Sequence, residues 1–146
     1  MQRFSCVALV DARGWVLLQE RDEHALISPE RWGYPGGHLE PGEQYSAGAV
    51  RELEEETGLV ITEGDLTLHE IAEVHHPETG SDDLVAIFAA ATTATDADID
   101  CREGRRIVFV DPAAIPGLSL TDSCGETLPR FLGSDLYRAL VASLTP

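Results

Sequence analysis

Basic side chains are scarce in this sequence. Ten Lys and Arg residues stand against 26 Asp and Glu residues, which gives the 146-residue chain a formal net charge of −16. A field of this sign repels polyanions, so it disfavours long nucleic acids that bind through their phosphates. A small anion can still bind through a bridging metal ion. We therefore expect small-molecule partners and no long nucleic acid.

Long apolar runs are absent as well. No stretch approaches the roughly 20 apolar residues that span a bilayer, and the N-terminal residues MQRFSCVALVDARG lack the charged start, the long apolar stretch and the cleavage site of a secretory signal. We therefore expect no membrane partner and a cytoplasmic location. The sequence has no internal repeat, linker or low-complexity segment, and its length is the commonest for one domain. Residues 1–146 are expected to form a single domain.

Cysteine is also sparse. Cys6, Cys101 and Cys124 are odd in number, and none forms a CxxC pair or stands at a spacing typical of a zinc site. This argues against a zinc centre and predicts free thiols in a reducing compartment.

The pattern of apolar residues and chain breakers predicts strands and helices in a mixed order. Such an order favours the α/β class, with a mixed β-sheet between helices in an α/β/α sandwich. Residues 20–37 contain Pro29, Gly33, Pro35, Gly36 and Gly37, which predicts a long ordered loop of the kind that is usually functional. Strands are expected at 4–10, 15–19, 66–75, 84–92 and 105–110, a helix at 44–57, and a helical region at 124–144 broken or bent near Pro129 and Gly133.

Glutamates crowd the helix expected at 44–57. With about 100° between successive residues, Glu52, Glu55 and Glu56 share one face, while Val50, Leu53 and Thr57 form a separate stripe suited to packing on a sheet. Like charges at this spacing destabilise a helix by roughly 0.2–0.5 kcal/mol per pair. Taken alone, such a run is usually a solvated face, here with Arg51 as a partner of Glu55. Three carboxylates on one face also suit a hard divalent ion such as Mg²⁺.

The surroundings of this run decide between the two interpretations. Gly37 is followed by five residues and Glu43, then by seven residues and the stretch Arg51-Glu52-Leu53-Glu54-Glu55-Glu56-Thr57-Gly58-Leu59. This arrangement resembles the signature of the Nudix hydrolase superfamily at every defined position. The resemblance implies the superfamily's α/β/α sandwich and its activity. That activity is the hydrolysis of a pyrophosphate bond in a nucleoside diphosphate linked to a group X, with Mg²⁺ as cofactor and Mn²⁺ as a substitute.

The resemblance also implies roles for single residues. Glu55 and Glu56 would be the principal helix ligands of the metal, with the carbonyl of Gly36 as a backbone ligand. Glu52 would be a further ligand or the catalytic base. Around them, Glu43 would pair with Arg51, while Gly37 and Gly58 would form the turn and the helix cap.

Glu103 adds a further acid beyond the signature. Glu103-Gly104 stands just before the strand expected at 105–110, and mutator-type triphosphate hydrolases of the superfamily carry a Glu-Gly at a similar place. This implies a metal ligand or the base at Glu103. The base is left open among Glu52, Glu56 and Glu103.

Substrate contacts are expected from four residues. By resemblance, Arg21 would contact phosphate, and His38 stands where related loops often have a lysine. Tyr34 is one of the aromatic residues that could stack on a base, although core packing is an equal alternative. Asp122 could accept hydrogen bonds from a base edge. The neighbours His75 and His76 face opposite sides of a strand, so they are expected to be core or surface residues.

The leading hypothesis is the hydrolysis of a nucleoside triphosphate, including an oxidised one, to the monophosphate and pyrophosphate. A hydrolase of ADP-ribose, nucleotide sugars or dinucleoside polyphosphates is the alternative within the enzyme class. A catalytically silent nucleotide sensor is the alternative outside it. Homodimers are common in the superfamily, so a homodimer is one of the expected assemblies.

Overall fold

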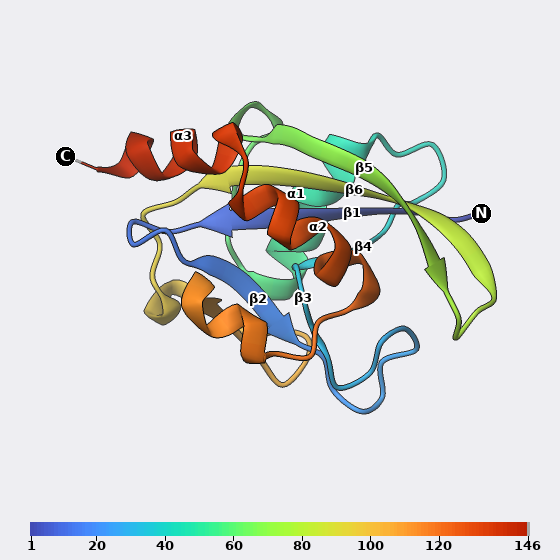
Figure 1. Ribbon diagram of the computed structural model, residues 1–146. Coiled ribbons are helices and arrows are strands. Elements are labelled where there is room, and N and C mark those ends of the chain that lie inside the picture. The colour runs from blue at the N-terminus through green and yellow to red at the C-terminus, as the bar shows by residue number, and fades with distance from the viewer. Residues whose placement is uncertain (146) are drawn as a thin grey trace.

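The computed structural model describes residues 1–145, and its elements follow one another in a mixed order (Figure 1). The long central strands come from apolar segments of the sequence, and the two longest helices pack on opposite faces of the sheet that these strands form. The strands are β1 (Arg3–Val10), β2 (Val16–Glu20), β3 (Trp32–Gly33), β4 (Gly36–His38), β5 (Thr67–His76), β6 (Ser81–Ala91) and β7 (Arg106–Val110). The helices are α1 (Tyr45–Thr57), α2 (Asp122–Leu132) and α3 (Asp135–Leu144), with short 3₁₀ turns at Glu63–Asp65, Asp96–Asp98 and Pro112–Gly117.

The strands form one mixed sheet in which β1 is central. β6 pairs with β1 in parallel and with β5 in an antiparallel hairpin, while β7 pairs with β2. β1 and β2 pair at Val10 and Val16, close to the turn that joins them. At the other end, β4 pairs with β1 and β3 pairs with β2. Two short strands therefore fill the space where β1 and β2 diverge.

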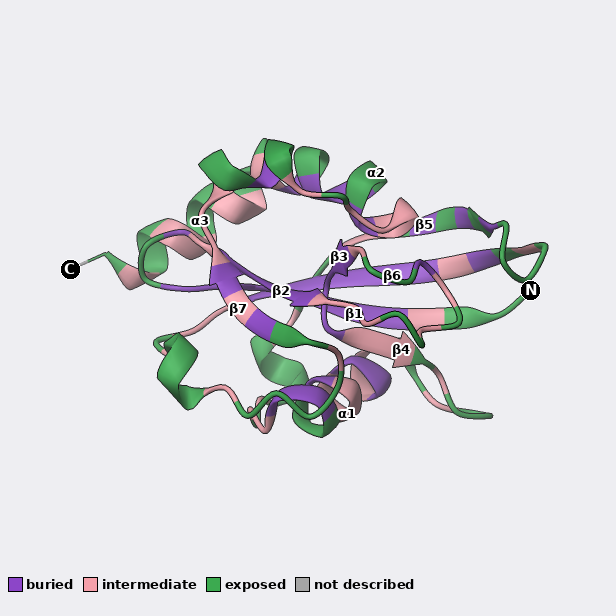
Figure 2. Cartoon of the chain, turned by 90° about the horizontal axis from the view of Figure 1, so that it is seen from below, coloured by how far each residue is buried: buried purple, intermediate pink, exposed green. Residues whose placement is uncertain are grey.

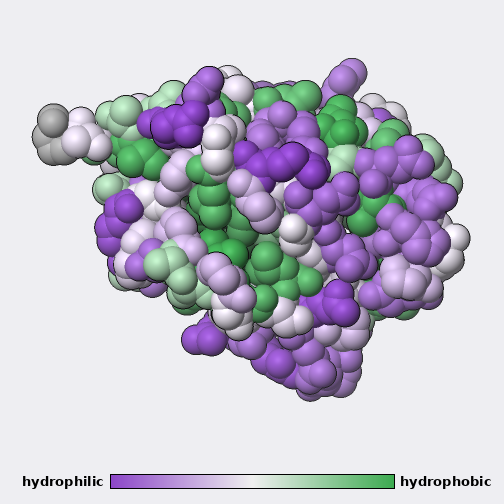
Figure 3. All heavy atoms as spheres, in the orientation of Figure 1, coloured by the Kyte–Doolittle hydropathy of each residue, from purple (hydrophilic) through white to green (hydrophobic). Residues whose placement is uncertain are grey.

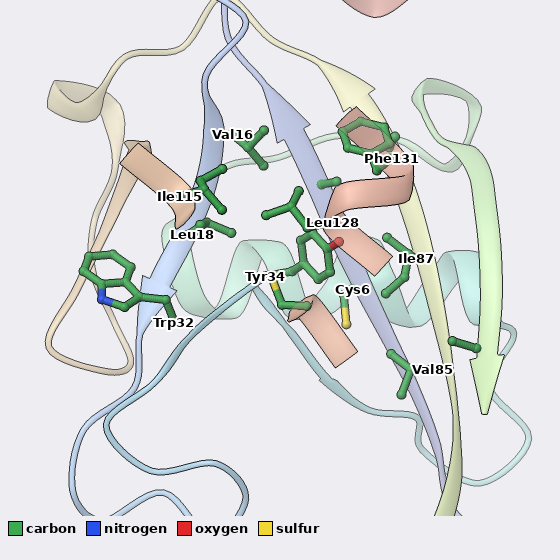
Figure 4. Packing of buried hydrophobic residues seen from close by; sticks show 14 of the residues in the cluster. Cys6, Val16, Leu18, Trp32, Tyr34, Val85, Ile87, Ile115, Leu128 and Phe131 are labelled. Carbon is green, nitrogen blue, oxygen red and sulfur yellow. The ribbon is translucent and has the colours of Figure 1, made fainter. Parts of the chain in front are cut away.

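Helices cover both faces of the sheet (Figure 2). Successive strand residues face opposite sides, so β1 supplies Val7 and Leu9 to the core under α1, and Ala8 and Val10 to the core under α2. Figure 4 shows this second core, with Tyr34 in its middle near Leu128 and Cys6. The predicted α/β class and its α/β/α layering are confirmed.

The element boundaries agree with the predictions to within a few residues. The structure differs mainly at 20–37, where β3 and β4 interrupt the expected loop. Strands of two and three residues that contain glycine show no alternation in the sequence. The helical region at 124–144 does divide in two, at Gly133 and Ser134, although Pro129 lies inside α2.

One face of the molecule has a hydrophobic region near its centre (Figure 3). On the face shown in Figure 3, hydrophobic residues gather near the centre and hydrophilic residues surround them. Among the helices within residues 1–145, none has the length and apolar character that a membrane crossing requires.

Candidate active site

Helix α1 presents its three signature glutamates in three different environments. Its C-terminal end is defined by Gly58, which has φ +77 and takes the left-handed cap conformation. Glu56 is 3% exposed, Glu52 is half-buried and Glu55 is exposed. The buried face includes Ala49, Leu53 and Thr57 together with Glu56.

The predicted separation of the acidic face from the apolar stripe is therefore wrong in part. Glu56 lies at about 40° from Glu52 on the helix, between Glu52 and Leu53 at about 100°. It consequently turns toward the sheet, while Val50 is only half-buried. The buried position of Glu56 makes it the acid that most needs a partner.

Two glycines of β4 allow close packing: Gly37 lets β4 approach this helix, and Gly36 lets β4 approach β1. A Cβ on Gly37 would lie 2.8 Å from the carboxyl group of Glu52, and a Cβ on Gly36 would lie 2.3 Å from the backbone oxygen of Ser5. The N–H of Gly36 donates to Oε2 of Glu56 at 2.9 Å. Gly37 thus leaves room for Glu52, and Gly36 supplies Glu56 with a hydrogen bond.

Glu103 reaches the same place from a loop tied to the end of α1. The backbone N–H of Arg102 donates to the carbonyl of Glu56, and that of Asp100 donates to the carbonyl of Thr57. On the other side, the amide of Gln19 donates to the carbonyl of Glu103 at 3.1 Å. These bonds hold Glu103 between the helix and strand β2.

The carboxyl groups gathered here perturb one another. Burial, followed by the neighbouring carboxyl of Glu103, raises the pKa of Glu56 to about 10 despite the hydrogen bond from Gly36. Burial also raises the pKa of Glu52, against the effect of Arg51. Within residues 1–145 no group of three or more His, Cys, Asp or Glu side chains already stands at metal-binding geometry. A divalent cation fits this donor set, because it would replace the protons that these crowded acids otherwise retain.

Arg51 organises the acids on the exposed side. Its guanidinium donates to both oxygens of Glu43, at 2.8 and 2.9 Å, and to the carbonyl of His38 at 3.0 Å. It also contacts Glu52 at 3.0 Å and Glu55 at 3.2 Å. The hydrogen bonds from Arg51 lower the pKa of Glu43 to about 2. The expected Glu43–Arg51 pair is present, and it clamps the loop after β4 onto α1.

A cavity of about 280 Å³ lies beside these acids. Glu52, Glu56 and Glu103 all line it, whereas Glu55 does not. The expected substrate residues Arg21, His38 and Tyr34 also belong to its wall. Tyr34 is mostly core, and its hydroxyl hydrogen-bonds that of Thr127 at 2.8 Å.

Asp122 is placed differently from the other expected substrate residues. It lies in the first turn of α2 and forms an ion pair with Arg31 at 3.3 Å. Its neighbours Thr121 and Ser123 line the cavity, but Asp122 does not. The structure therefore separates it from the acids of α1.

Two further residues of the cavity wall, Ser28 and His76, were not predicted as site residues. Ser28 has φ +48, a backbone conformation that nothing in the surrounding sequence indicates. His76 was expected in the core or at the surface, because His75 and His76 face opposite sides of a strand. The sequence does not show which of these sides borders a cavity. The alternation of His75 and His76 was the available signal, and His76 is indeed the buried one.

An acidic helix beside a cavity in an α/β/α sandwich suits a hydrolase that handles phosphate groups with a metal ion. The family model described as "NUDIX domain" matches residues 1–126, and the chain belongs to this family. Members of this family generally use divalent metal ions.

Curated relatives share part of the chain. The cow m7GpppN-mRNA hydrolase NUDT17 is 46% identical over 52 residues, which are 36% of this chain and 17% of the cow protein. The uncharacterized Nudix hydrolase PA4841 of Pseudomonas aeruginosa is 31% identical over 93 residues, 63% of this chain and 53% of that protein. The chain thus spans a sixth to a half of the length of these relatives.

Solved structures share the fold over most of the chain. A MutT protein from Methanosarcina mazei has a TM-score of 0.73 and 23% identity, covering 89% of this chain and 91% of its own. A Francisella tularensis bifunctional NMN adenylyltransferase/ADP ribose pyrophosphatase, complexed with AMP and a Mn ion, has a TM-score of 0.73 and 15% identity. The match covers 90% of this chain and 41% of that one. At these identities the likeness shows the fold alone.

Proposed function

We propose that this protein hydrolyses a nucleoside triphosphate, canonical or oxidised, to the monophosphate and pyrophosphate with Mg²⁺ as cofactor. The observation that carries the proposal is the convergence of Glu52, Glu56 and Glu103 on one cavity beside Arg21. A nucleotide is the small anion that such a cavity accepts once a cation offsets the acids.

The metal would be held by Glu56, Glu52 and Glu103, with the carbonyl of Gly36 and with Glu55. Bound there, it would neutralise phosphate oxygens and lower the pKa of a water molecule. Glu55 is paired with Arg51 in this structure, so its participation requires release of that contact. Mn²⁺ is expected to substitute for Mg²⁺.

The protein's own groups would bind and orient the substrate. Nε of Arg21 donates to the carbonyl of Ile27 at 2.8 Å, which holds the guanidinium at the cavity wall where it can contact a phosphate. The base that accepts the proton of the attacking water is one of Glu52, Glu56 and Glu103. Gly37, Gly58, Glu43 and Arg51 support the site through the contacts described above.

A second candidate is the hydrolysis of ADP-ribose, a nucleotide sugar or a dinucleoside polyphosphate. The position of Asp122 favours it, because the acid expected to recognise a base is engaged with Arg31 and does not line the cavity. A catalytically silent sensor remains the alternative outside the enzyme class. The intact set of signature glutamates argues against it.

A panel assay tests these candidates. Canonical and 8-oxo nucleoside triphosphates, ADP-ribose, nucleotide sugars and diadenosine polyphosphates are incubated with Mg²⁺, and phosphate and pyrophosphate are measured separately. Pyrophosphate released from one triphosphate, and lost in Glu55→Gln and Glu56→Gln, supports the first candidate. Activity only on a sugar or a dinucleotide overturns it in favour of the second. Nucleotide binding without turnover anywhere in the panel points to the sensor.

A further inference from the structure

The cavity has a second wall that the acids do not explain. It is formed where the loop between β2 and β3 meets the β5–β6 hairpin, and it includes Ser28 and His76. Neither residue belongs to the metal-binding set proposed above, and both are buried. A polar group that is buried beside a cavity and lacks a protein partner is a place where a ligand can supply the missing hydrogen bond.

His76 is held in one orientation by a buried carboxylate. Its Nδ1 lies 2.6 Å from Oδ2 of Asp83, which is fully buried. The other oxygen of Asp83 accepts from the hydroxyl of Ser81 at 2.6 Å and from the backbone N–H of Gln2 at 2.8 Å. Burial alone would raise the pKa of Asp83, but the hydrogen bonds from Ser81, His76 and Gln2 outweigh it and hold the pKa at about 2.

This pairing determines what His76 presents to the cavity. Because Asp83 is ionised, it accepts, and Nδ1 of His76 donates. Nε2, on the far side of the ring from Asp83, has no hydrogen-bond partner within residues 1–145 and can bond a ligand hydroxyl, which both donates and accepts. The ring is packed edge-on against Phe4, with centroids 5.3 Å apart, so its direction is fixed.

Ser28 offers the complementary group. Its Oγ is buried and has no hydrogen-bond partner within residues 1–145, and its backbone takes the left-handed conformation with φ +48. Its N–H donates to Oε1 of Glu78 at 2.9 Å. Glu78 lies two residues after His76, so this bond ties the loop to the hairpin that carries the histidine. An unpaired buried hydroxyl costs free energy, and a left-handed serine adds strain.

We propose that Ser28 and His76 form a sugar subsite, in which Oγ of Ser28 and Nε2 of His76 hydrogen-bond neighbouring hydroxyl groups of a ribose. A serine hydroxyl and an unpartnered ring nitrogen suit a diol, and among the described residues that line the cavity Arg21 is the only Lys or Arg. The inference rests on the proposed function. The ribose is either that of the nucleoside or a sugar carried as group X.

Two ligand pairs separate these sources. Dissociation constants are measured by calorimetry in Ca²⁺, which takes the same oxygen ligands as Mg²⁺, for ATP against 2′,3′-dideoxy-ATP and for ADP-ribose against ADP. The wild type is expected to prefer either ATP over 2′,3′-dideoxy-ATP or ADP-ribose over ADP by about tenfold, the effect of one or two hydrogen bonds. The first pair reports on the ribose of the nucleoside, and the second on a sugar in group X.

The variants Ser28→Ala and His76→Asn are expected to abolish this preference. Their dissociation constants for the less preferred ligand, 2′,3′-dideoxy-ATP or ADP, should stay within about twofold of the wild-type values. Ser28→Ala removes a hydroxyl with no partner and so leaves folding intact. Asn at position 76 retains a donor for Asp83. The matched control is His75→Asn, because His75 makes the corresponding contact with Asp82 at 2.8 Å on the exposed side of the hairpin.

Hydrolysis of the panel with Mg²⁺ is followed in parallel. A preference below twofold in the wild type, or one that persists in both variants, overturns the sugar subsite even where hydrolysis proceeds. If no substrate of the panel is hydrolysed but the wild type shows the ligand preference and Ser28→Ala loses it, the proposed function is overturned and the sugar subsite is supported. Equal losses in His75→Asn would also overturn the subsite, since they would trace the effect to the hairpin as a whole.

Discussion

Under the proposed function, Glu56 is the residue on which we expect the chemistry of the cavity to depend most. It is buried on the face of α1 that packs against the sheet, and the N–H of Gly36 is its hydrogen-bond donor. Glu103 lies close enough to raise its pKa further. An ionised carboxyl in such a place costs free energy unless a cation accompanies it. We therefore expect Glu56 to couple metal binding to the stability of the helix.

Replacing Glu56 with glutamine should separate these two effects. We expect Glu56→Gln to lower kcat by on the order of 10²–10³-fold, as for other groups that stabilise charge in a transition state. The melting temperature in EDTA should stay level or rise, because glutamine, unlike Glu56, takes up no proton on folding, and the rise in melting temperature on adding Mg²⁺ should shrink. Thermal melts with and without Mg²⁺ measure this. Glu54→Gln, an exposed neighbour on the same helix, is the control, and an equal loss of activity there would contradict the assignment.

The same residue predicts a pH dependence of stability in the EDTA-treated protein. The folded-state pKa of Glu56 is about 10, above the value of about 4.3 for an unperturbed glutamate. Between these values the folded chain holds a proton that the unfolded chain has released. Its contribution to stability is thus full below about pH 4 and is lost as the pH rises toward 10.

We therefore expect the melting temperature in EDTA to fall between pH 6 and pH 9 more steeply for the wild type than for Glu56→Gln. Thermal melts across this range, in matched ionic strength, provide the measurement. Parallel curves for the two proteins would show that Glu56 is ionised in the folded chain without a metal.

Among the elements, the loop that precedes β7 depends on a glycine. Gly104 has φ +81, and a Cβ there would lie 2.7 Å from the backbone oxygen of Glu20. This close approach lets the loop follow β2, with the N–H of Arg105 donating to the same oxygen. The neighbouring Glu103 is carried to the cavity by this backbone path.

Two glycines permit a matched test of that path. Gly80, in the β5–β6 turn, has φ +67 but no atom within 4 Å of an added Cβ. We expect Gly80→Ala to cost about 1–2 kcal/mol of stability through backbone strain alone and to leave activity unchanged. Gly104→Ala should cost more and reduce kcat, because the clash displaces Glu103. Urea unfolding and steady-state kinetics on both variants check this, and equal kinetics would refute a positioning role for Gly104.

The whole molecule carries a strong excess of negative charge. Its formal net charge of −16 produces self-repulsion that destabilises a compact state. Ion pairs relieve this repulsion locally, for example between Arg130 and Glu70 at 2.7 Å and between Arg105 and Glu23 at 2.7 Å. Ten basic residues cannot offset 26 acidic ones.

Salt should therefore stabilise this protein. From about 0.01 M to about 1 M salt, the Debye length falls from about 30 Å to about 3 Å, so repulsion between distant carboxylates is screened. We expect the melting temperature in EDTA to rise over this range, in NaCl and in tetramethylammonium chloride alike. A rise in NaCl alone would indicate a specific sodium site, and a fall in both would show that the ion pairs outweigh the repulsion.

Much of the site was predictable because its information is local. The sequence alone placed a helix at 44–57, and the observed helix ends where Gly58 predicts. The resemblance to the Nudix signature implied the pair of Glu43 and Arg51 that the structure contains. Capping residues and helical spacing act over a few positions, so the chain records them directly.

What the tertiary structure decided concerns contacts between segments far apart in the chain. It buried Glu56, left Glu55 paired with Arg51, and brought Glu103 to the same cavity. It also separated Asp122 from that cavity and placed Ser28 and His76 in its wall. Burial and the approach of one carboxyl to another depend on how α1, the loop before β7 and the β5–β6 hairpin pack on the sheet. That packing depends on contacts among many residues that are distant in the sequence. A helix, its cap and its charges depend on a few neighbouring residues, so they can be predicted directly from the sequence.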